Sequence, residues 1–300
     1  MLLSVVLLFT PLVPFVFLYY VWYFYDKDTP KKGGRPNQWY RSLGFWKYYV
    51  DYFPISLKKT AELPPENNYI VGSHPHGILS LGAFANFATE ATDFSVKFPG
   101  IKPLIVTLPS QFYFALKREI NLAHGAISSY AESIENALSG PKKGTAVCIV
   151  VGGAEEALNA RPDNYDLKLA TRKGFVKLAI RNGAWLVPMY NFGENNAYGQ
   201  VDNHPGTRLR KFQDSFKKFF GFSPPLFFGR GIFQYTFGLL PYRTPITTVI
   251  GKPIPVVQNS APTQEEIDEL HKEYCNGLID LFEEHKTKYG IPEDAHLNIY

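Results

Sequence analysis

The sequence predicts an α/β fold, with a mostly parallel sheet flanked by helices and an N-terminal membrane segment ahead of it. Short apolar runs alternate with amphipathic runs at helical spacing along most of the 300 residues. One run, residues 145–151, is apolar throughout, which is typical of a strand that is covered on both faces. Residues 1–25 contain no charged side chain. We therefore divide the chain into a hydrophobic membrane anchor, residues 1–30, and one large domain, residues 31–300.

Composition excludes several classes of protein. The formal net charge of +4 is too small and too diffuse to indicate a nucleic-acid-binding protein. Aromatic residues make up 16% of the chain, which suits a protein in contact with lipid. The two cysteines, Cys148 in an apolar run and Cys275 in a helical pattern, indicate neither a disulfide framework nor a zinc site. We expect a reducing compartment and no metal.

The first 25 residues predict a membrane segment. As a helix this stretch would be about 37 Å long at roughly 1.5 Å per residue, enough to cross a hydrocarbon core of ~30 Å. Pro11 and Pro14 near its middle leave two forms open, a kinked single span and a re-entrant hairpin. A cleavable signal peptide is the alternative, but it requires a basic start and a small-residue cleavage site. The basic residues that follow predict that the body faces the cytosol: Lys27, Lys31, Lys32, Arg35 and Arg41.

Two aromatic-rich segments have two interpretations each. Residues 39–53 interleave aromatic and charged side chains, and residues 206–220 carry a Phe and Leu stripe beside basic residues. Either segment can be a helix packed on the core or a helix that lies at the membrane surface. The sequence leaves both interpretations open.

The first strand of the domain ends in a polar turn. Residues 69–71 form a β-branched and aromatic run, followed by Gly72, His74, Pro75, His76 and Gly77, and helical spacing resumes over residues 78–94. This order places the imidazoles at the carboxyl edge of a sheet. With an ordinary pKa of about 6.5, a neutral imidazole can take the proton of an alcohol that attacks an acyl carbonyl. Two alternatives remain: one ring caps the helix while the other is merely exposed, or both bind a metal, although no third ligand cluster accompanies them.

The remaining elements continue the alternation. We predict strands at residues 103–108, 145–151, 184–194 and 247–251, and helices at residues 110–124, 129–138, 171–183 and 263–288. Capping boxes of Ser129 with Glu132 and of Thr263 with Glu266 would open two of these helices, and Gly183 would end a third. Residues 222–245, rich in glycine, proline and aromatic residues, predict a long loop over a binding cleft.

A second polar turn follows the apolar strand 145–151. It contains Gly152, Gly153, Glu155 and Glu156. One acid could orient an imidazole or bind a substrate hydroxyl; the alternative is a solvated helix start, where acids are favoured by the helix dipole. A phosphate-binding P-loop is excluded because no Gly-Lys-Ser/Thr follows.

Three further positions are candidates for substrate binding. Arg172 and Lys173 precede a helix and could meet the phosphates of an acyl carrier, or they form a solvated basic pair. Glu194 stands at the tip of the strand 184–194. Arg230 lies within Gly-Arg-Gly in the long loop.

From about residue 25 to the C-terminus the chain resembles the type-two diacylglycerol acyltransferase and monoacylglycerol acyltransferase family. The blocks that carry the resemblance occur in order along the chain: YFP at 52–54, HPHG at 74–77, VGGAEEAL at 151–158, RKGFVKLA at 172–179, LVPMYNFGEN at 186–195, and GRG at 229–231 with ITTVIGKPI after it.

The resemblance implies an enzyme of the endoplasmic reticulum membrane with its catalytic body in the cytosol, and lipid droplets as a second location. It implies transfer of a fatty acyl group from acyl-CoA, a co-substrate, to the hydroxyl of a mono- or diacylglycerol, with no other cofactor. The partners implied are acyl-CoA, the acylglycerol and a lipid bilayer, without nucleic acid; a homo-oligomer stays open. The fold implied is that of the glycerolipid acyltransferases.

The resemblance also implies roles for site residues. His76 is the general base, since family members can replace the first histidine of the motif and keep the second. Glycerolipid acyltransferases carry an Asp five residues after the catalytic His, but here those positions are Leu79 and Leu81. Glu156 is therefore the candidate for orienting the ring or holding the acceptor, and the lesser candidates for the site are His74, Gly77, Gly152, Gly153, Arg172, Lys173, Glu194 and Arg230.

The expected mechanism is direct transfer, in which backbone N–H groups near Gly77 or Gly152 stabilise the oxyanion. No Gly-x-Ser-x-Gly elbow supplies a serine nucleophile. The alternatives are a wax-alcohol acyltransferase of the same family, a membrane lipid ester hydrolase and a non-catalytic lipid scaffold. The motifs do not distinguish a monoacylglycerol from a diacylglycerol acceptor, because FQYTFGLLPYR resembles one group whereas YDKDTPKKGG and FATEATDF resemble the other.

Overall fold

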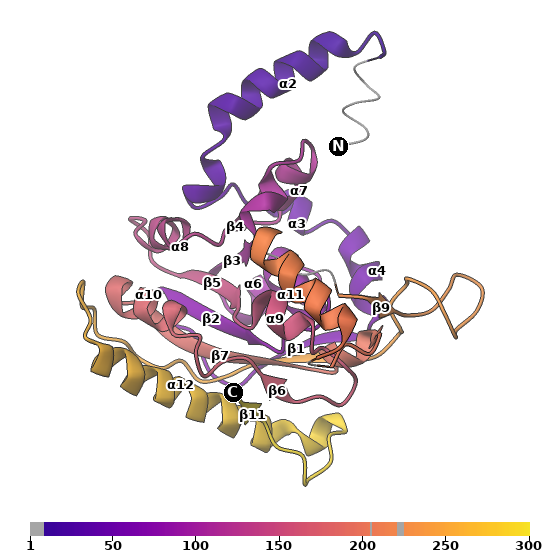
Figure 1. Cartoon of the computed structure of the whole chain (residues 1–300). Coiled ribbons are helices and arrows are strands. Elements are labelled where there is room, and N and C mark those ends of the chain that lie inside the picture. Colours follow the sequence, from indigo (N-terminus) through magenta and orange to yellow (C-terminus); the bar gives the residue numbers. More distant parts are fainter. Residues whose placement is uncertain (1–8, 205, 221–224) are drawn as a thin grey trace.

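A seven-stranded sheet with helices on both faces forms the body of the protein (Figure 1). The computed structural model describes residues 9–204, 206–220 and 225–300. The strand order in the sheet is β1-β10-β7-β2-β5-β3-β4. The bounds of these strands are β1 Ile55–Lys59, β2 Tyr69–His74, β3 Lys102–Thr107, β4 Ala126–Ser128, β5 Thr145–Val150, β7 Trp185–Phe192 and β10 Ile246–Ile250.

The sheet is mostly parallel, as the sequence predicts. The neighbouring strands β7, β2, β5, β3 and β4 all run in one direction, with Val71 of β2 opposite Cys148 of β5 and Val187 of β7. Strand β10 runs antiparallel to β7, and β1 runs parallel to β10 at the edge. The carboxyl ends of the parallel strands therefore meet at one edge of the sheet, which is where α/β proteins place their ligands.

Helices cover both faces of this sheet. Tyr69 and Val71 pack with Phe87 and Phe94 on the side of α5 and α6, whereas Ile70 packs on the opposite side with the helices α8, α10 and α12. The alternation follows from the two-residue period of a strand. The helices are α2 Val13–Asp26, α3 Gln38–Arg41, α4 Phe45–Tyr52, α5 Leu81–Ala88, α6 Phe94–Lys97, α7 Lys117–Ala123, α8 Ala131–Leu138, α9 Gly153–Ala157, α10 Gly174–Asn182, α11 Arg208–Phe220 and α12 Gln264–His285.

Short elements complete the chain. Strands β6 Asp166–Leu167 and β11 Asn298–Ile299 pair in parallel, and β8 Gly199–Gln200 pairs antiparallel with β9 Phe227–Phe228. The 3-10 turns are η1 Thr29–Lys31, η2 Pro109–Phe112, η3 Glu194–Ala197 and η4 Thr287–Tyr289.

Several predicted boundaries are wrong. The helix predicted at 78–94 is split into α5 and α6, and the one predicted at 110–124 is interrupted at Leu116, whose φ is +64°. Helix α8 begins at Ala131 with Tyr130 as N-cap and no side-chain cap, so the capping box of Ser129 with Glu132 does not form. Strands β1 and β4 were not predicted. The capping box of Thr263 with Glu266 and the C-cap at Gly183 are confirmed.

The N-terminal segment is described in part. Helix α2 has 14 residues and many exposed apolar side chains, including Phe15 and Phe17. Among residues 9–204, 206–220 and 225–300, no helix combines the length and the apolar character that a membrane span needs. Residues 1–8 of the predicted anchor lie outside the described residues. Arg41, predicted as part of the basic flank, is instead buried, where its Nη1 donates to the carbonyls of Phe87 at 2.8 Å and His124 at 2.7 Å.

The two aromatic-rich segments both form helices on the body. In residues 39–53, Val50 and Phe53 pack inward while Trp39, Phe45 and Tyr48 stay exposed, so core packing and an exposed aromatic face occur together. In α11, Phe212 of the predicted stripe is exposed. Among residues 208–216 of α11, the buried one is Gln213, which accepts a hydrogen bond of 3.0 Å from Asn203.

Candidate functional site

The candidate site lies where β2, β5 and β7 end. Because these strands are adjacent and parallel, the turns after them come together at one edge. The turn after β2 carries His76, α9 after β5 carries Glu156, and Glu194 follows β7. The structure therefore brings together the residues that the sequence selects from three separate turns.

His74, the last residue of β2, is fully buried. Its Nε2 lies 3.0 Å from the hydroxyl of Tyr274 on α12, and that hydroxyl donates to the carbonyl of Gly72 at 3.1 Å. The hydroxyl therefore accepts from Nε2–H, which leaves the lone pair on Nδ1, an atom without a partner among the described residues. Burial lowers the pKa of His74 to about 3. His74 is thus a neutral, buried residue that holds β2 against α12, and its catalytic role stays a prediction.

His76 is the imidazole at the surface of the site. It follows a cis peptide bond between His74 and Pro75, and its side chain is half-buried. Its Nδ1 lies 2.9 Å from the carbonyl oxygen of Gly77, and since a carbonyl only accepts, Nδ1 must carry the proton. The lone pair is then on Nε2, which makes no hydrogen bond with the described part of the chain. Burial lowers the pKa of His76, so the ring is neutral near pH 7.

Two buried glutamates hold the loop that carries His76. Oε1 of Glu156 accepts from the backbone N–H of His76 at 2.6 Å, and Oε2 accepts from that of Lys168 at 3.0 Å. Glu194 accepts from the N–H groups of Leu81 at 2.7 Å and Gly82 at 2.8 Å. One carboxylate thus fixes the start of the loop and the other fixes the first turn of α5.

The hydrogen bonds of the two glutamates bear on two predictions: that a histidine caps the following helix, and that Glu156 orients the His76 ring. The α5 N–H groups are bonded to Glu194, so neither histidine caps the helix. Glu156 bonds to the backbone of His76 and not to its ring, which is held by the Gly77 carbonyl. Burial raises the pKa of both carboxyls to about 7, against the opposing effect of the N–H donors.

Two predicted glycines allow these carboxylates to approach. A Cβ on Gly77 would lie 2.6 Å from Cγ of Glu194, and one on Gly152 would lie 2.2 Å from Oε2 of Glu156. Gly77 also has a φ of +61°, which other residues rarely adopt. Gly153 has a similar φ of +62°, but its Cβ position has no atom within 4 Å. The first two glycines therefore serve the carboxylate contacts.

The predicted basic residues lie in other surroundings. Arg172 pairs with Glu155 at 3.2 Å, and 41% of its side chain is exposed. Lys173 pairs with Asp268 of α12 at 2.7 Å. Arg230 donates to the Tyr52 hydroxyl at 2.7 Å and stacks over the Tyr52 ring. The hydrogen bonds of Arg230 hold the loop around β9 and not the His76 turn.

Sequence reasoning missed a buried amide network beside the site. Asn191 of β7 donates to the Ser73 hydroxyl at 2.9 Å and to the His74 carbonyl at 3.1 Å. Its Oδ1 accepts from Thr248 of β10 at 2.7 Å, and Asn86 of α5 donates to that threonine at 2.7 Å. The network joins β2, β7, β10 and α5. The only sequence signal was polarity at position 191 within an apolar strand.

A small polar cavity lies beside the loop. Its volume is about 60 Å³, and its lining includes Pro75, Tyr190, Asn191 and Glu194. Such a volume holds water but not an acyl chain. This cavity therefore does not account for the expected acyl-chain site.

Comparison with known proteins gives consistent names. The family model described as "Diacylglycerol acyltransferase" matches residues 5–300. The chain is 49% identical to 2-acylglycerol O-acyltransferase 1 of Bos taurus over 279 residues, 93% of this chain and 83% of that protein. It is 49% identical to Diacylglycerol O-acyltransferase 2 of Homo sapiens over 283 residues, 94% and 73% of the two chains. It is 48% identical to human 2-acylglycerol O-acyltransferase 3 over 297 residues, 99% and 87% of the two chains.

Among solved structures, the 1-acyl-sn-glycerophosphate acyltransferase PlsC of Thermotoga maritima matches with a TM-score of 0.44 and 11% identity. The match covers 79% of this chain and 76% of that one.

Proposed function

This chain belongs to the diacylglycerol acyltransferase family, and we propose that it transfers a fatty acyl group from acyl-CoA to the free hydroxyl of a mono- or diacylglycerol. It is an acylglycerol O-acyltransferase, as its relatives are named, with about half of its residues identical to theirs over nearly the whole chain. The proposal adds the donor, the catalytic residue and the membrane setting.

The observation that carries the catalytic proposal is the tautomer of His76. Its Nδ1–H donates to the Gly77 carbonyl, which leaves Nε2 as a proton acceptor without a partner among the described residues. The lowered pKa keeps the ring neutral near pH 7. A general base needs both properties, a free lone pair and the unprotonated form at the working pH.

The reaction then proceeds by direct attack. Nε2 of His76 takes the proton of the acceptor hydroxyl as its oxygen bonds to the thioester carbonyl carbon. The tetrahedral intermediate collapses, the C–S bond breaks, and the imidazolium returns the proton to the CoA thiolate. The products are the new ester and free CoA, and no acyl-enzyme forms.

The loop that carries His76 also offers donors for the oxyanion. The backbone N–H groups of Gly77 and Ile78 make no hydrogen bond within the described residues. Fixed N–H donors that face a developing oxyanion stabilise it in a site from which water is excluded. Glu156 and Glu194 keep this stretch of main chain in place through three of their backbone contacts.

For the donor, we propose that Arg172 meets the phosphates of CoA. About 41% of its side chain is exposed, and its Nη2 donates to Oε2 of Glu155 at 3.2 Å. An exposed pair of this kind contributes little stability, so its exchange for a phosphate costs little. Lys173, which pairs with Asp268, is the second candidate on the same turn.

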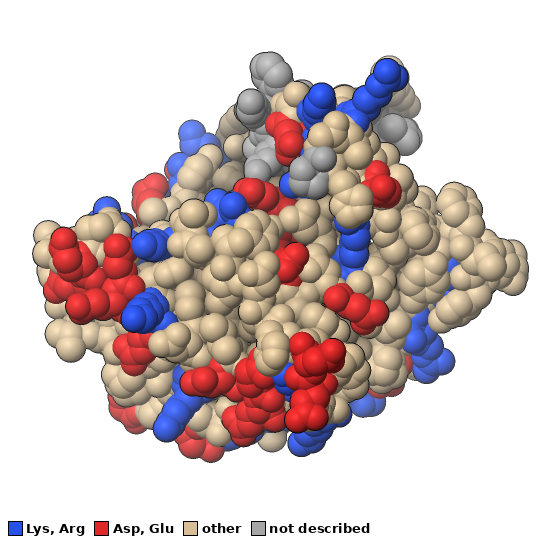
Figure 2. All heavy atoms as spheres, turned by 60° about the horizontal axis from the view of Figure 1, so that its bottom comes forward, with Lys and Arg blue, Asp and Glu red and all other residues tan. Residues whose placement is uncertain are grey.

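We propose that the protein works at the endoplasmic reticulum membrane, and at lipid droplets, with its body in the cytosol. Exposed apolar residues of α2 support contact between this helix and lipid. Figure 2 shows patches of acidic side chains on the face that α12 covers, on the opposite side of the body from α2 (Figure 1). An anionic membrane surface repels such a face and favours the side of α2. The acidic residues of α12 that are exposed are Glu265, Glu266, Asp268, Glu269, Glu273, Asp280 and Glu284.

The test uses full-length protein in lipid nanodiscs with labelled oleoyl-CoA. Monoacylglycerol, diacylglycerol and a long-chain alcohol are offered separately, and both CoA release and the lipid product are followed. We expect His76→Ala to lower turnover by about 10²- to 10⁴-fold, whereas the exposed His296→Ala serves as the matched control and keeps full activity. Near wild-type turnover of His76→Ala would remove the ring from the base role. Ester consumption without added acyl-CoA would favour the hydrolase, and product from the alcohol alone would favour the wax-alcohol enzyme.

A further inference from the structure

A cavity of about 420 Å³ lies between the N-terminal helix and the sheet edge. Helix α2 and η1 form one wall, and η2 with the end of β4 form the other. The size is in the range of small-molecule sites, which is roughly 300–1,000 Å³. The lining is mostly aromatic residues and prolines, with three charged residues and one serine: Tyr23, Phe24, Lys27, Asp28, Pro30, Lys31, Pro109, Phe112, Tyr113, Ser128 and Tyr130.

Ser128 is a polar group built into this apolar wall. It is the last residue of β4 and only 2% exposed. Its Oγ has no hydrogen-bond partner among the described residues. A buried hydroxyl without a partner is costly, and Ser128 belongs to the cavity lining, so an oxygen of a molecule bound there could supply the missing partner.

Two lysines belong to the same cavity lining as Ser128. Lys27 and Lys31 line the cavity, and neither forms an ion pair within the described part of the chain. Nζ of Lys31 lies 5.6 Å from the centre of the Tyr130 ring, so the charge stays over the cavity wall. Asp28 lowers the formal charge of the lining to +1, which still favours an anion over a cation.

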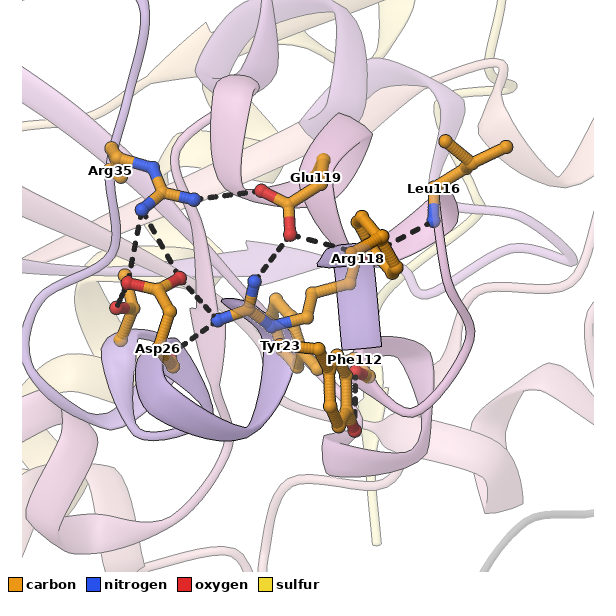
Figure 3. A network of polar contacts seen from close by, with 9 residues as sticks. Tyr23, Asp26, Arg35, Phe112, Leu116, Arg118 and Glu119 are labelled. Atoms are coloured by element: carbon orange, nitrogen blue, oxygen red, sulfur yellow. Dashed lines mark hydrogen bonds and ion pairs between the residues drawn. The ribbon is translucent and has the colours of Figure 1, made fainter. Parts of the chain in front are cut away.

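The wall formed by α2 is fixed to the body before any ligand binds. Figure 3 shows Arg118 of α7 and Arg35 bridging Asp26 and Glu119. Arg118 is fully buried and lies 2.6 Å from Oδ2 of Asp26, and Arg35 lies 3.1 Å from Asp26 and 2.7 Å from Glu119. The Tyr23 hydroxyl adds a bond of 3.5 Å to the carbonyl of Phe112 across the cavity. A preformed site loses little binding energy to ordering.

The cavity is separate from the His76 site. Both lie at the carboxyl edge of the sheet, but β5 and β3 stand between β2 and β4. Three strand spacings of about 4.8 Å put the two roughly 14 Å apart along the edge. A molecule that fills this cavity need not touch the reacting atoms.

We propose that this cavity binds a single-chain lipid with an anionic head group, whose oxygens accept from Ser128 and Lys31 and whose chain lies along the aromatic wall of Tyr23, Phe112 and Tyr113. The proposal rests on the proposed function in one respect: an acylglycerol acyltransferase works in surroundings that contain acyl chains. The shared head chemistry is a carboxylate or a phosphate, from a free fatty acid, a lysophosphatidate or an acyl-CoA. Aromatic and apolar walls with a few placed polar groups are typical of such sites.

The test is photo-crosslinking of the full-length protein in neutral-lipid nanodiscs with a palmitate that carries a diazirine on its chain. We expect adducts in the peptides that contain Tyr23 or Phe112 and Tyr113. Ser128→Ala and Lys31→Met should each lower the labelling about tenfold, the usual effect of losing a hydrogen bond to a charged group. The matched controls are the exposed neighbours Ser129→Ala and Lys32→Met, which should label like the wild type.

Competition identifies the head group. Excess oleate, oleoyl-lysophosphatidate and oleoyl-CoA are compared with neutral monooleoylglycerol. Displacement by the anionic lipids and not by the neutral one supports the proposal, and the strongest competitor identifies carboxylate or phosphate. The proposal is overturned if Ser128→Ala and Lys31→Met label like the wild type. It is also overturned if the neutral lipid displaces the probe as well as the anionic lipids do. Acyl transfer without labelling refutes this proposal alone, whereas labelling without acyl transfer refutes the proposed function alone.

Discussion

Replacement of Gly77 by alanine tests whether Glu194 holds the loop that carries His76. Gly77 and Gly153 have nearly the same backbone conformation, with φ of +61° and +62°. An alanine in this left-handed region costs about 1–2 kcal/mol at either position. Only at Gly77 does the new Cβ meet a neighbour, Cγ of Glu194 at 2.6 Å, while the position at Gly153 is open to 4 Å. Gly153→Ala is therefore a matched control for backbone strain.

The clash must move Glu194 away from at least one of its two N–H partners on α5. Loss of one hydrogen bond to a charged group costs about 1.5–3 kcal/mol, and this is the expected difference between Gly77→Ala and Gly153→Ala. At about 2–4 °C per kcal/mol, the melting temperatures of the two variants should differ by roughly 3–12 °C. We expect turnover to fall further in Gly77→Ala, since the same loop carries the His76 ring.

The assay is thermal unfolding of both variants in one detergent, with turnover measured on the same preparations. Equal melting temperatures would show that the Glu194 contact does not hold the loop. A destabilised Gly77→Ala with full turnover would show that the contact holds α5 without positioning His76.

Three further predictions concern the buried groups. Tyr274→Phe leaves Nε2–H of His74 without its acceptor and should lower the free energy of unfolding by about 1–3 kcal/mol, measured by denaturation; no change would mean that the His74 contact carries no energy. The raised pKa of Glu156, about 7 against an ordinary 4.5, means that its contribution is full below pH 4.5 and is lost as the pH rises through 7. The melting temperature of the wild type should therefore fall relative to Glu156→Gln between pH 5 and 8, and parallel curves would refute the shift. Because burial lowers the pKa of His76, the acid limb of kcat/KM should lie below pH 6.5, and a limb above that value would contradict a ring without a carboxylate partner.

The sequence could predict features that depend on residues close together in the chain. The His76 turn, the glycine turn after β5 and the tip of β7 each follow a strand directly, so adjacency in the chain was enough to place them at one edge. Strands β1 and β4 were missed because β1 carries charged residues at its end and β4 is only Ala126–Ser128. The break at Leu116 was missed because no glycine marks its positive φ.

The roles within the site depend on contacts between distant parts of the chain. Glu156 is 80 residues from the backbone N–H that it accepts, and Glu194 is 113 residues from Leu81. Tyr274 meets His74 across 200 residues. An acid near a histidine in a motif predicts a charge relay, yet both acids bind main-chain N–H groups. Residue type selected the right positions, and only the fold could assign which atoms they contact.

The hydrogen-bond partner of Nδ1 determines how basic the His76 ring is. A carboxylate on Nδ1 would stabilise the imidazolium and raise the pKa of the ring, as in a serine hydrolase triad. The Gly77 carbonyl fixes the same tautomer but brings no net negative charge, and burial lowers the pKa. The His76 ring is therefore less basic than a triad histidine and stays unprotonated near pH 7. A weaker base is sufficient when the acyl donor is a thioester, because the thiolate leaves readily and no serine has to be activated first. If His76 is the base that we propose, its loop geometry suits transfer from an activated donor better than hydrolysis of an ordinary ester.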